Sequence, residues 1–201
     1  MKVLLINGSA KEKGCTFTAL SEVARGLNES GVETEILSLG TKPVADCMGC
    51  GKCRETGACV FGDIVNEIVE KAKTADGFVF GSPVYYAHAS GRLLSVLDRA
   101  FYSGGKEFAF KPGAAVASAR RGGTTASLEV INKHFSINQM PIATSNYWNM
   151  VHGNTPDEVR QDKEGMRTMY NLGRNMAWMI KCIQAGPEHP QNEKESTNFI
   201  R

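Results

Sequence analysis

Short, continuous apolar runs alternate in this chain with longer segments whose apolar residues recur every three or four positions. The runs are residues 2–8 (KVLLING), 77–83 (GFVFGSP) and 113–119 (GAAVASA). A run of this length predicts a strand buried on both faces, as in a parallel sheet. The periodic segments predict helices, whose apolar stripe packs against such a sheet. The alternation therefore predicts an α/β fold.

Five helices and two more strands complete the pattern. The helices are expected at residues 16–30, 63–75, 90–101, 124–138 and 156–183, and the strands at residues 32–39 and 140–145. Right-handed crossovers then give a doubly wound, five-stranded parallel sheet of flavodoxin-like order 2-1-3-4-5, with helices on both faces. Asp63 is expected to cap its helix. We expect one domain, residues 1–183, and a polar tail, residues 184–201.

The charge balance excludes several classes of partner. The 23 basic and 21 acidic residues give a net charge of +2. No stripe dense in Lys or Arg is present, so nucleic acid is not an expected partner. The sequence shows no apolar stretch of the roughly 18–20 residues that span a bilayer. The N-terminus does not resemble a signal peptide. We therefore expect a cytoplasmic protein that binds neither nucleic acid nor membrane.

The loops after the first, third and fourth predicted strands meet at one edge of such a sheet, where doubly wound proteins bind ligands. The first loop, residues 8–20 (GSAKEKGCTFTAL), is rich in Gly, Ser and Thr and leads into a helix start with free backbone N–H groups. This favours a phosphate site, and a tight turn with a polar cap is the alternative. Neither a Walker sequence nor Gly-x-Gly-x-x-Gly occurs, which indicates a mononucleotide.

The other two loops add aromatic and basic groups. Residues 81–91 (GSPVYYAHASG) place two tyrosines directly after a buried strand, which suits a planar heteroaromatic ring. Residues 117–127 (ASARRGGTTAS) combine two arginines with a Gly-Gly pair that lets the backbone approach a ligand. The alternatives are a tyrosine that packs on the next helix and a solvated basic loop.

Together these stretches resemble the NADPH-dependent FMN reductase branch of the flavodoxin-like superfamily. The motifs GSAKEKGCTFTAL, CMGCGKCRETGACVFGD, GSPVYYAHASGRLLSVLDR and SARRGGTTASLEVI occur in the same order over about residues 1–150. The resemblance implies FMN contacts from the phosphate to the ring at Ser9, Lys11, Gly14, Cys15, Thr16, Pro83, Val84, Tyr85, Tyr86, Ala119, Arg120 and Gly122. Many relatives carry Asn in place of Cys15. A thiol at this helix start is expected to have a lowered pKa.

The resemblance also implies an activity, an NAD(P)H-dependent flavin oxidoreductase that passes electrons to a quinone, a nitro or azo compound, a metal ion or a protein. Hydride transfer to the flavin needs no side-chain acid or base, so no catalytic residue is predicted. The alternatives are an electron carrier, which the net charge of +2 disfavours, and a redox-sensing flavoprotein. A homodimer or homotetramer is expected, since the family assembles through the region of residues 90–105.

Four cysteines lie in the loop after the second predicted strand. They are Cys47, Cys50, Cys53 and Cys59, with the spacing C-x2-C-x2-C-x5-C. Four thiolates suit a [4Fe–4S] cluster, in which each iron takes one, and the stretch resembles the motif of the iron–sulfur flavoproteins in this superfamily. Tetrahedral zinc and reduced thiols without metal are the alternatives. The spacing does not choose among the three.

Overall fold

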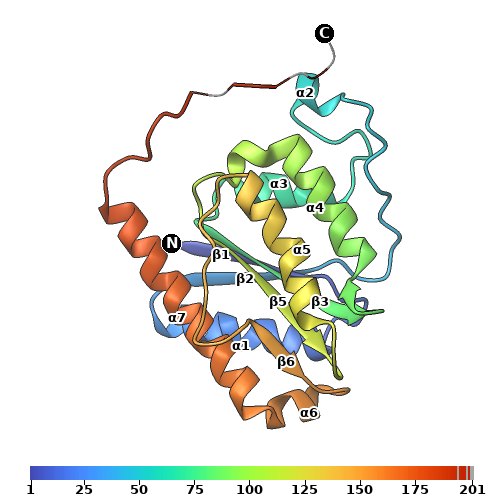
Figure 1. Ribbon diagram of the computed structural model, residues 1–201, viewed down its shortest axis with the longest axis vertical. Helices are drawn as coiled ribbons and strands as arrows, with labels where there is room; N and C mark the ends of the chain where they lie inside the picture. Colours follow the sequence, from blue (N-terminus) through green and yellow to red (C-terminus); the bar gives the residue numbers. More distant parts are fainter. Residues whose placement is uncertain (194, 198, 200–201) are drawn as a thin grey trace.

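A sheet with helices on both faces forms the centre of the computed structural model, which describes residues 1–193, 195–197 and 199 (Figure 1). The parallel strands are β1 (Lys2–Asn7), β2 (Glu33–Ser38), β3 (Gly77–Tyr85), β5 (Gly113–Ala119) and β6 (Met150–His152). A two-residue strand, β4 (His88–Ala89), pairs antiparallel with the end of β3. The order β2-β1-β3-β5-β6 confirms the doubly wound topology, because β4 lies off this path.

Two layers of helices cover the sheet. The helices are α1 (Cys15–Glu29), α2 (Cys53–Thr56), α3 (Ile64–Ala72), α4 (Gly91–Gly104), α5 (Thr124–Ile137), α6 (Pro156–Gln161) and α7 (Lys163–Ala185), with a 3-10 turn at Gly105–Glu107. In Figure 1, α1 and α7 cover one face, and α3, α4 and α5 cover the other. The Asp63 side chain accepts a hydrogen bond from the Val65 N–H and caps α3, as expected.

Alternate side chains of the central strands enter separate cores. In β1, Val3 and Leu5 pack on the α1 and α7 side, whereas Leu4 and Ile6 pack on the α3, α4 and α5 side. All four are fully buried. Because successive strand side chains point to opposite faces, a strand covered on both sides must be apolar throughout. This burial explains the continuous apolar runs in the sequence.

The predicted fifth strand is wrong in position. Within residues 140–145 only Ile142 pairs with the sheet, at an isolated bridge to Gly113. The following residues turn toward α7, where the Thr144 carbonyl accepts a hydrogen bond from the Asn175 side chain (2.8 Å). The edge strand is instead β6, which pairs with residues 117–119 of β5.

The predicted last helix, residues 156–183, is two helices. Asp162 interrupts it, because its side chain accepts a hydrogen bond from the Gly165 N–H (2.9 Å) and caps the start of α7. The same carboxylate accepts from the His152 N–H at the sheet edge (2.7 Å). A short polar side chain that bonds to the backbone in this way favours a helix start over a helix interior.

Helix α7 ends at Ala185, and the described residues beyond it form neither helix nor strand. The division into a domain, residues 1–183, and a tail, residues 184–201, stays a prediction. Of the helices that the structure describes, none combines the length and the apolar character needed to cross a bilayer.

Candidate functional site

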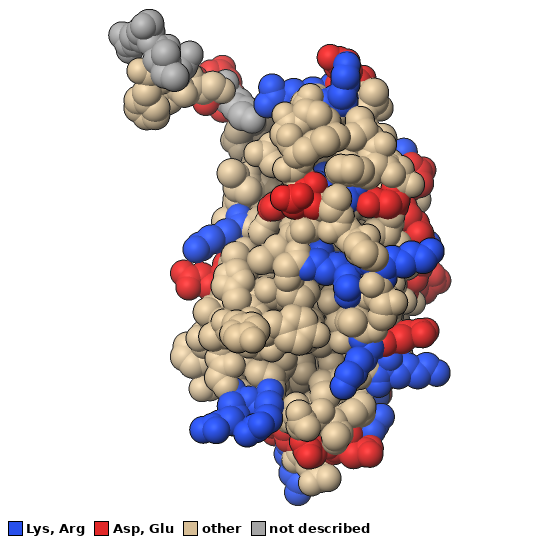
Figure 2. Space-filling view, turned by 90° about the vertical axis from the view of Figure 1, so that its right-hand side faces the viewer, with Lys and Arg blue, Asp and Glu red and all other residues tan. Residues whose placement is uncertain are grey.

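The three loops singled out in the sequence meet at the carboxyl ends of the strands, on the right in Figure 1. The Gly8 N–H donates to the Gly81 carbonyl (2.8 Å), which joins the first loop to the second. The Ser90 hydroxyl donates to the Gly8 carbonyl (3.2 Å) and also caps α4. A Cβ atom on Gly123 would lie 2.4 Å from the Ala87 Cα, so the third loop touches the second. Figure 2 faces this end of the molecule, where uncharged residues form most of the middle of the view.

Hydrogen bonds within the first loop fix its conformation and leave the N–H groups at the start of α1 available to a ligand. Buried Asn7 accepts from the Ser9 N–H (3.1 Å) and donates to the Glu12 carbonyl (3.1 Å). The Ser9 hydroxyl accepts from the Lys11 N–H (3.1 Å). Gly14 precedes α1, and no side chain caps this helix among the residues described. Its first N–H groups therefore point to the loop without an intrahelical acceptor and suit an anion.

Cys15 lies at this helix start, and its thiol differs from the expectation. Burial raises the pKa of Cys15 above its ordinary value. The backbone N–H and the charge of Lys11 act in the opposite direction but do not outweigh burial. The expected lowering of the Cys15 pKa is therefore wrong, because desolvation of the thiolate exceeds the stabilisation by nearby positive charge.

The second loop is a two-residue hairpin with unusual backbone angles. Tyr85 pairs with His88, and the two residues between them, Tyr86 and Ala87, have φ values of 49° and 62°. Such positive angles are those of a type I′ turn, which usually takes Asn or Gly. A residue with a Cβ atom in this region costs of order 1–3 kcal/mol, and such strain gathers at functional sites. Both tyrosine rings are exposed, Tyr86 completely, so they are available to a planar ligand.

The third loop joins β5 to α5 and has little side-chain bulk. Gly123 has a φ of 92° and stands directly before α5, which no side chain caps among the described residues. A Cβ atom on Gly122 would meet nothing within 4 Å. Arg120 is exposed, and the Ala119 carbonyl accepts a hydrogen bond from the Gly153 N–H (3.0 Å). The loop therefore offers open backbone and a free guanidinium beside the hairpin.

The four cysteines line one pocket of about 490 Å³ above the second half of α4. The other walls include Phe61, Arg99 and Tyr102. The Cys53 thiol donates to the Tyr102 carbonyl (3.6 Å). All four cysteines are free thiols, and Cys47 and Cys50 are exposed. The structure thus brings the predicted ligands to one place, on the outer side of the helix layer.

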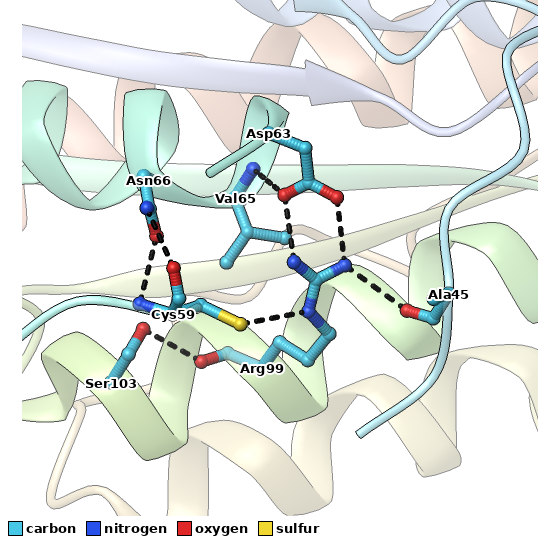
Figure 3. A network of polar contacts seen from close by, with 7 residues as sticks. All are labelled: Ala45, Cys59, Asp63, Val65, Asn66, Arg99 and Ser103. Carbon is cyan, nitrogen blue, oxygen red and sulfur yellow. Dashed lines mark hydrogen bonds and ion pairs between the residues drawn. The ribbon is translucent and has the colours of Figure 1, made fainter. Parts of the chain in front are cut away.

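An arginine that the sequence analysis did not single out also lines this pocket and lies at the centre of a network of polar contacts (Figure 3). Arg99 is 1% exposed, and its guanidinium makes two hydrogen bonds to the carboxylate of Asp63 (2.7 and 2.9 Å). Its Nε–H donates to the Cys59 sulfur (3.2 Å). Asn66 holds the backbone of Cys59 in both directions, as donor and as acceptor, each at 2.9 Å.

The carboxyl of Asp63 responds to this contact. Its burial acts to raise the pKa of Asp63, but the hydrogen bonds from Arg99 and from the Val65 N–H outweigh burial, so the pKa is lowered. Asp63 is therefore ionised at neutral pH and compensates the buried cation. An arginine within the apolar helix "RLLSVLDRAF" was a weak signal in the sequence, because its partners lie about 40 residues away.

Four cysteine thiols are the donor set that a [4Fe–4S] cluster takes. Among the residues that the structure describes, no three His, Cys, Asp or Glu side chains converge on one ion position. Tetrahedral zinc needs its ligands at about 2.0–2.3 Å from one centre. A cubane takes each thiolate on a different iron, so its ligands surround a larger volume. The four cysteines that line this pocket supply one thiol for each iron of a cubane.

The first loop likewise fits a mononucleotide phosphate. Its observed features are the uncapped start of a 15-residue helix, the buried hydroxyls of Ser9 and Thr16, and the adjacent Lys11. The hairpin beside it supplies exposed aromatic faces. These are the groups that an FMN phosphate and ring require.

Comparisons with known proteins agree with this arrangement. The NADPH-dependent FMN reductase family matches residues 1–155. An iron-sulfur flavoprotein of Methanocaldococcus jannaschii is 35% identical over 92% of this chain and 100% of its own length. An iron-sulfur flavoprotein of Methanosarcina thermophila is 31% identical over 92% of this chain and 97% of its own.

The fold agrees with solved structures as well. An NAD(P)H:quinone oxidoreductase from Methanothermobacter marburgensis superposes with a TM-score of 0.61 at 18% identity, over 88% of this chain and 96% of that one. At this identity the likeness concerns the fold alone. The family match covers all three loops and the cysteine stretch. The chain therefore belongs to the NADPH-dependent FMN reductase family and is a flavin oxidoreductase.

Proposed function

We propose that this chain binds FMN in the three loops at the sheet edge, takes electrons from NAD(P)H, and carries a [4Fe–4S] cluster on Cys47, Cys50, Cys53 and Cys59. The acceptor is a small molecule, such as a quinone, a nitro or azo compound or a metal ion, or another protein. The observation that best supports FMN binding is that the three loops contact one another beside the start of α1, which no described side chain caps. The names of the iron-sulfur flavoprotein relatives support the cluster.

The first loop holds the phosphate in this proposal. The N–H groups of Cys15 and Thr16 and the hydroxyl of Ser9 donate to phosphate oxygens, and Lys11 adds positive charge. Gly14 keeps the approach to these N–H groups free of a side chain. Thr16 is buried at this helix start, beside the proposed phosphate position.

The second and third loops hold the ring. The backbone of Pro83 and Val84 lies along the ribityl chain, and Tyr85 and Tyr86 cover the ring. Ala119, Arg120 and Gly122 close the far side. The bound FMN supplies the hydride and electron chemistry, and these loops orient it and leave one ring face open to the nicotinamide.

The four cysteines hold the cluster, which supplies one-electron chemistry when bound. The pocket is lined by all four cysteines and by apolar side chains such as Phe61. A region of this kind separates an oxidoreductase with two redox centres from a plain FMN reductase.

The deciding experiment is an absorbance spectrum of protein purified anaerobically after expression with ample iron. We expect two flavin bands and a broad brown shoulder, together with about four irons and four acid-labile sulfides per chain. NADPH should bleach the flavin bands and sustain turnover with a quinone. Flavin without iron or sulfide would end the cluster proposal but leave the reductase. A lack of turnover with each acceptor class would favour a carrier or a sensor.

We also propose a homodimer or homotetramer that assembles through the region of residues 90–105. Tyr102 in this region is exposed, and Phe61 and Met48 on the neighbouring cysteine loop are exposed as well. These apolar side chains would be covered in an oligomer. Light scattering at micromolar concentration tests this, and a monomer mass would contradict it.

A further inference from the structure

Cys59 is held by more side-chain contacts than the exposed Cys47 and Cys50. Cys47 and Cys50 are exposed and lie in a glycine-rich loop. Cys59 is partly buried, and Asn66 fixes both its N–H and its carbonyl. Its sulfur also accepts a hydrogen bond from the Nε–H of Arg99 (3.2 Å). The backbone and the sulfur of this one residue are therefore both in place before any metal binds.

The guanidinium of Arg99 has little freedom to leave this position. Two of its nitrogens bond to Asp63, and one of these also donates to the Ala45 carbonyl (3.1 Å). The Cζ atom of this guanidinium lies 4.6 Å from the centre of the Phe61 ring. All three guanidinium nitrogens donate hydrogen bonds, so the orientation of the planar group is fixed and its Nε–H points toward the Cys59 sulfur. A lysine ammonium has no such fixed fork.

A buried hydrogen-bond donor next to a cysteine pocket affects a cluster more than an exposed donor would. Four thiolates bring negative charge to the pocket, and the interior screens charge less than water does. Hydrogen bonds to the sulfurs and nearby charge set the reduction potential of iron–sulfur clusters. A donor to a cysteine sulfur stabilises the reduced, more negative state and so raises the potential.

We infer that Arg99, fixed by Asp63, is a positioning residue for the cluster: it holds Cys59 ready as the fourth ligand and donates a hydrogen bond to its sulfur that raises the reduction potential. The inference rests on the proposed cluster and goes beyond it, because it assigns a role to an arginine that binds neither iron nor flavin.

The test is an anaerobic redox titration of the holoprotein, followed by absorbance, for the parent and for Arg99→Lys. The lysine keeps the positive charge but loses the Nε–H fork. We expect Arg99→Lys to bind iron and FMN, with the cluster potential shifted to more negative values. Arg92→Lys is the matched control. Arg92 lies two turns earlier on α4 and binds the same loop through the Gly40 and Thr41 carbonyls (2.7 and 3.3 Å).

A second variant tests the same role if Arg99→Lys does not fold. Asp63→Asn combined with Arg99→Met removes both charges together, which avoids an unpaired buried charge. It should show the same negative shift. An unchanged potential in either folded variant, or an equal shift in Arg92→Lys, would overturn the role of Arg99 while the cluster proposal stands. A parent protein without iron would overturn both proposals.

Discussion

Two regions of the molecule are built in opposite ways. The first, called the flavin edge, comprises the three loops proposed to bind FMN, residues 8–20, 81–91 and 117–127, and the second is the cysteine loop, residues 39–63. At the flavin edge, short turns are joined by backbone contacts between buried residues, such as Gly8 to Gly81 (2.8 Å). The cysteine loop runs from β2 to α3, and only the four-residue helix α2 interrupts it. It contains five glycines with positive φ, which are Gly40, Gly49, Gly51, Gly57 and Gly62.

Helix α4 contacts both regions, but with different parts of its length. Its first end meets the flavin edge through Ser90, which is buried. Its second half meets the cysteine loop through Arg99, nine residues later, or about 14 Å along the axis at ~1.5 Å per residue. The loops of the flavin edge are thus joined to one another by contacts of the polypeptide itself. The cysteine loop is held at a few side-chain contacts, and a bound group would complete it.

The largest effect should come from single Cys→Ser changes in the loop. If the four cysteines bind one cluster, each change at Cys47, Cys50, Cys53 or Cys59 should abolish bound iron while FMN stays, because one lost thiolate opens an iron to solvent. Iron and acid-labile sulfide are assayed on anaerobic protein. Cys182→Ser is the control, since this exposed cysteine lies on α7, outside the pocket.

The same series can break the comparison. If the loop holds thiols without metal, the four variants will differ from one another and the parent will contain no sulfide. If Cys182→Ser also loses iron, the loss reflects general damage and not the pocket. Equal loss of iron at all four positions, with iron retained in Cys182→Ser, would mean that the four cysteines bind iron as one cooperative unit even though the loop itself has few contacts.

The second effect concerns the rigid edge. Gly123→Val should destabilise the protein by about 3 kcal/mol or more and lower FMN content, because φ is 92° and a Cβ atom would lie 2.4 Å from the Ala87 Cα. Gly122→Ala is the matched control for stability, since a Cβ atom there meets nothing within 4 Å. Urea denaturation measures both. Equal stability of the two variants would show that the third loop yields easily.

The sequence predicted the layers of this fold better than its edge. The strand at residues 113–119 has the predicted bounds, because seven consecutive buried residues mark the length of a strand that is covered on both faces. The edge strand was missed, since β6 has three residues and no period can be read from so few. Pro141 and Ile142 carried the apolar signal, but the chain leaves the sheet there for α7.

The candidate sites divide in the same way. Loop composition singled out the three loops and the cysteine stretch, each of which the structure brings together, because these motifs are local in the sequence. Arg99 was missed, because its role depends on Asp63 and Cys59, which only the packing of α3 and α4 brings close. A contact between side chains 36 and 40 residues apart leaves no periodic trace.

The third effect tests the phosphate position. Thr16→Glu should weaken FMN binding at least ~100-fold, since a buried carboxylate would face the phosphate in a medium that screens charge poorly. Thr16→Val keeps the volume and removes only the hydroxyl, so a loss of about ten-fold is expected. Fluorescence titration of FMN into stripped protein gives both constants. Parent-like affinity in Thr16→Glu would place the phosphate elsewhere.

The smallest effect is the response of the cysteine loop to acid. Because the pKa of Asp63 is lowered in the folded protein, its ion pair with Arg99 contributes stability above the unfolded pKa of about 3.9. That contribution is lost as the pH falls through the lower, folded pKa. Asp63 is about one-third exposed, so solvent reduces the effect to about 1 kcal/mol.

Thermal unfolding of metal-free protein at pH 6 and near pH 3 measures this contribution. The parent should lose about 1 kcal/mol more between the two than Asp63→Asn, which cannot titrate at this position. Asp157→Asn is the control, because both side chains of the Asp157–Arg160 pair are largely exposed and the pair should contribute close to nothing. A parent and an Asp63→Asn variant with the same pH dependence would mean that this carboxylate does not anchor the loop. The loop would then depend on Asn66 and Arg92, and the contrast with the flavin edge would be sharper still.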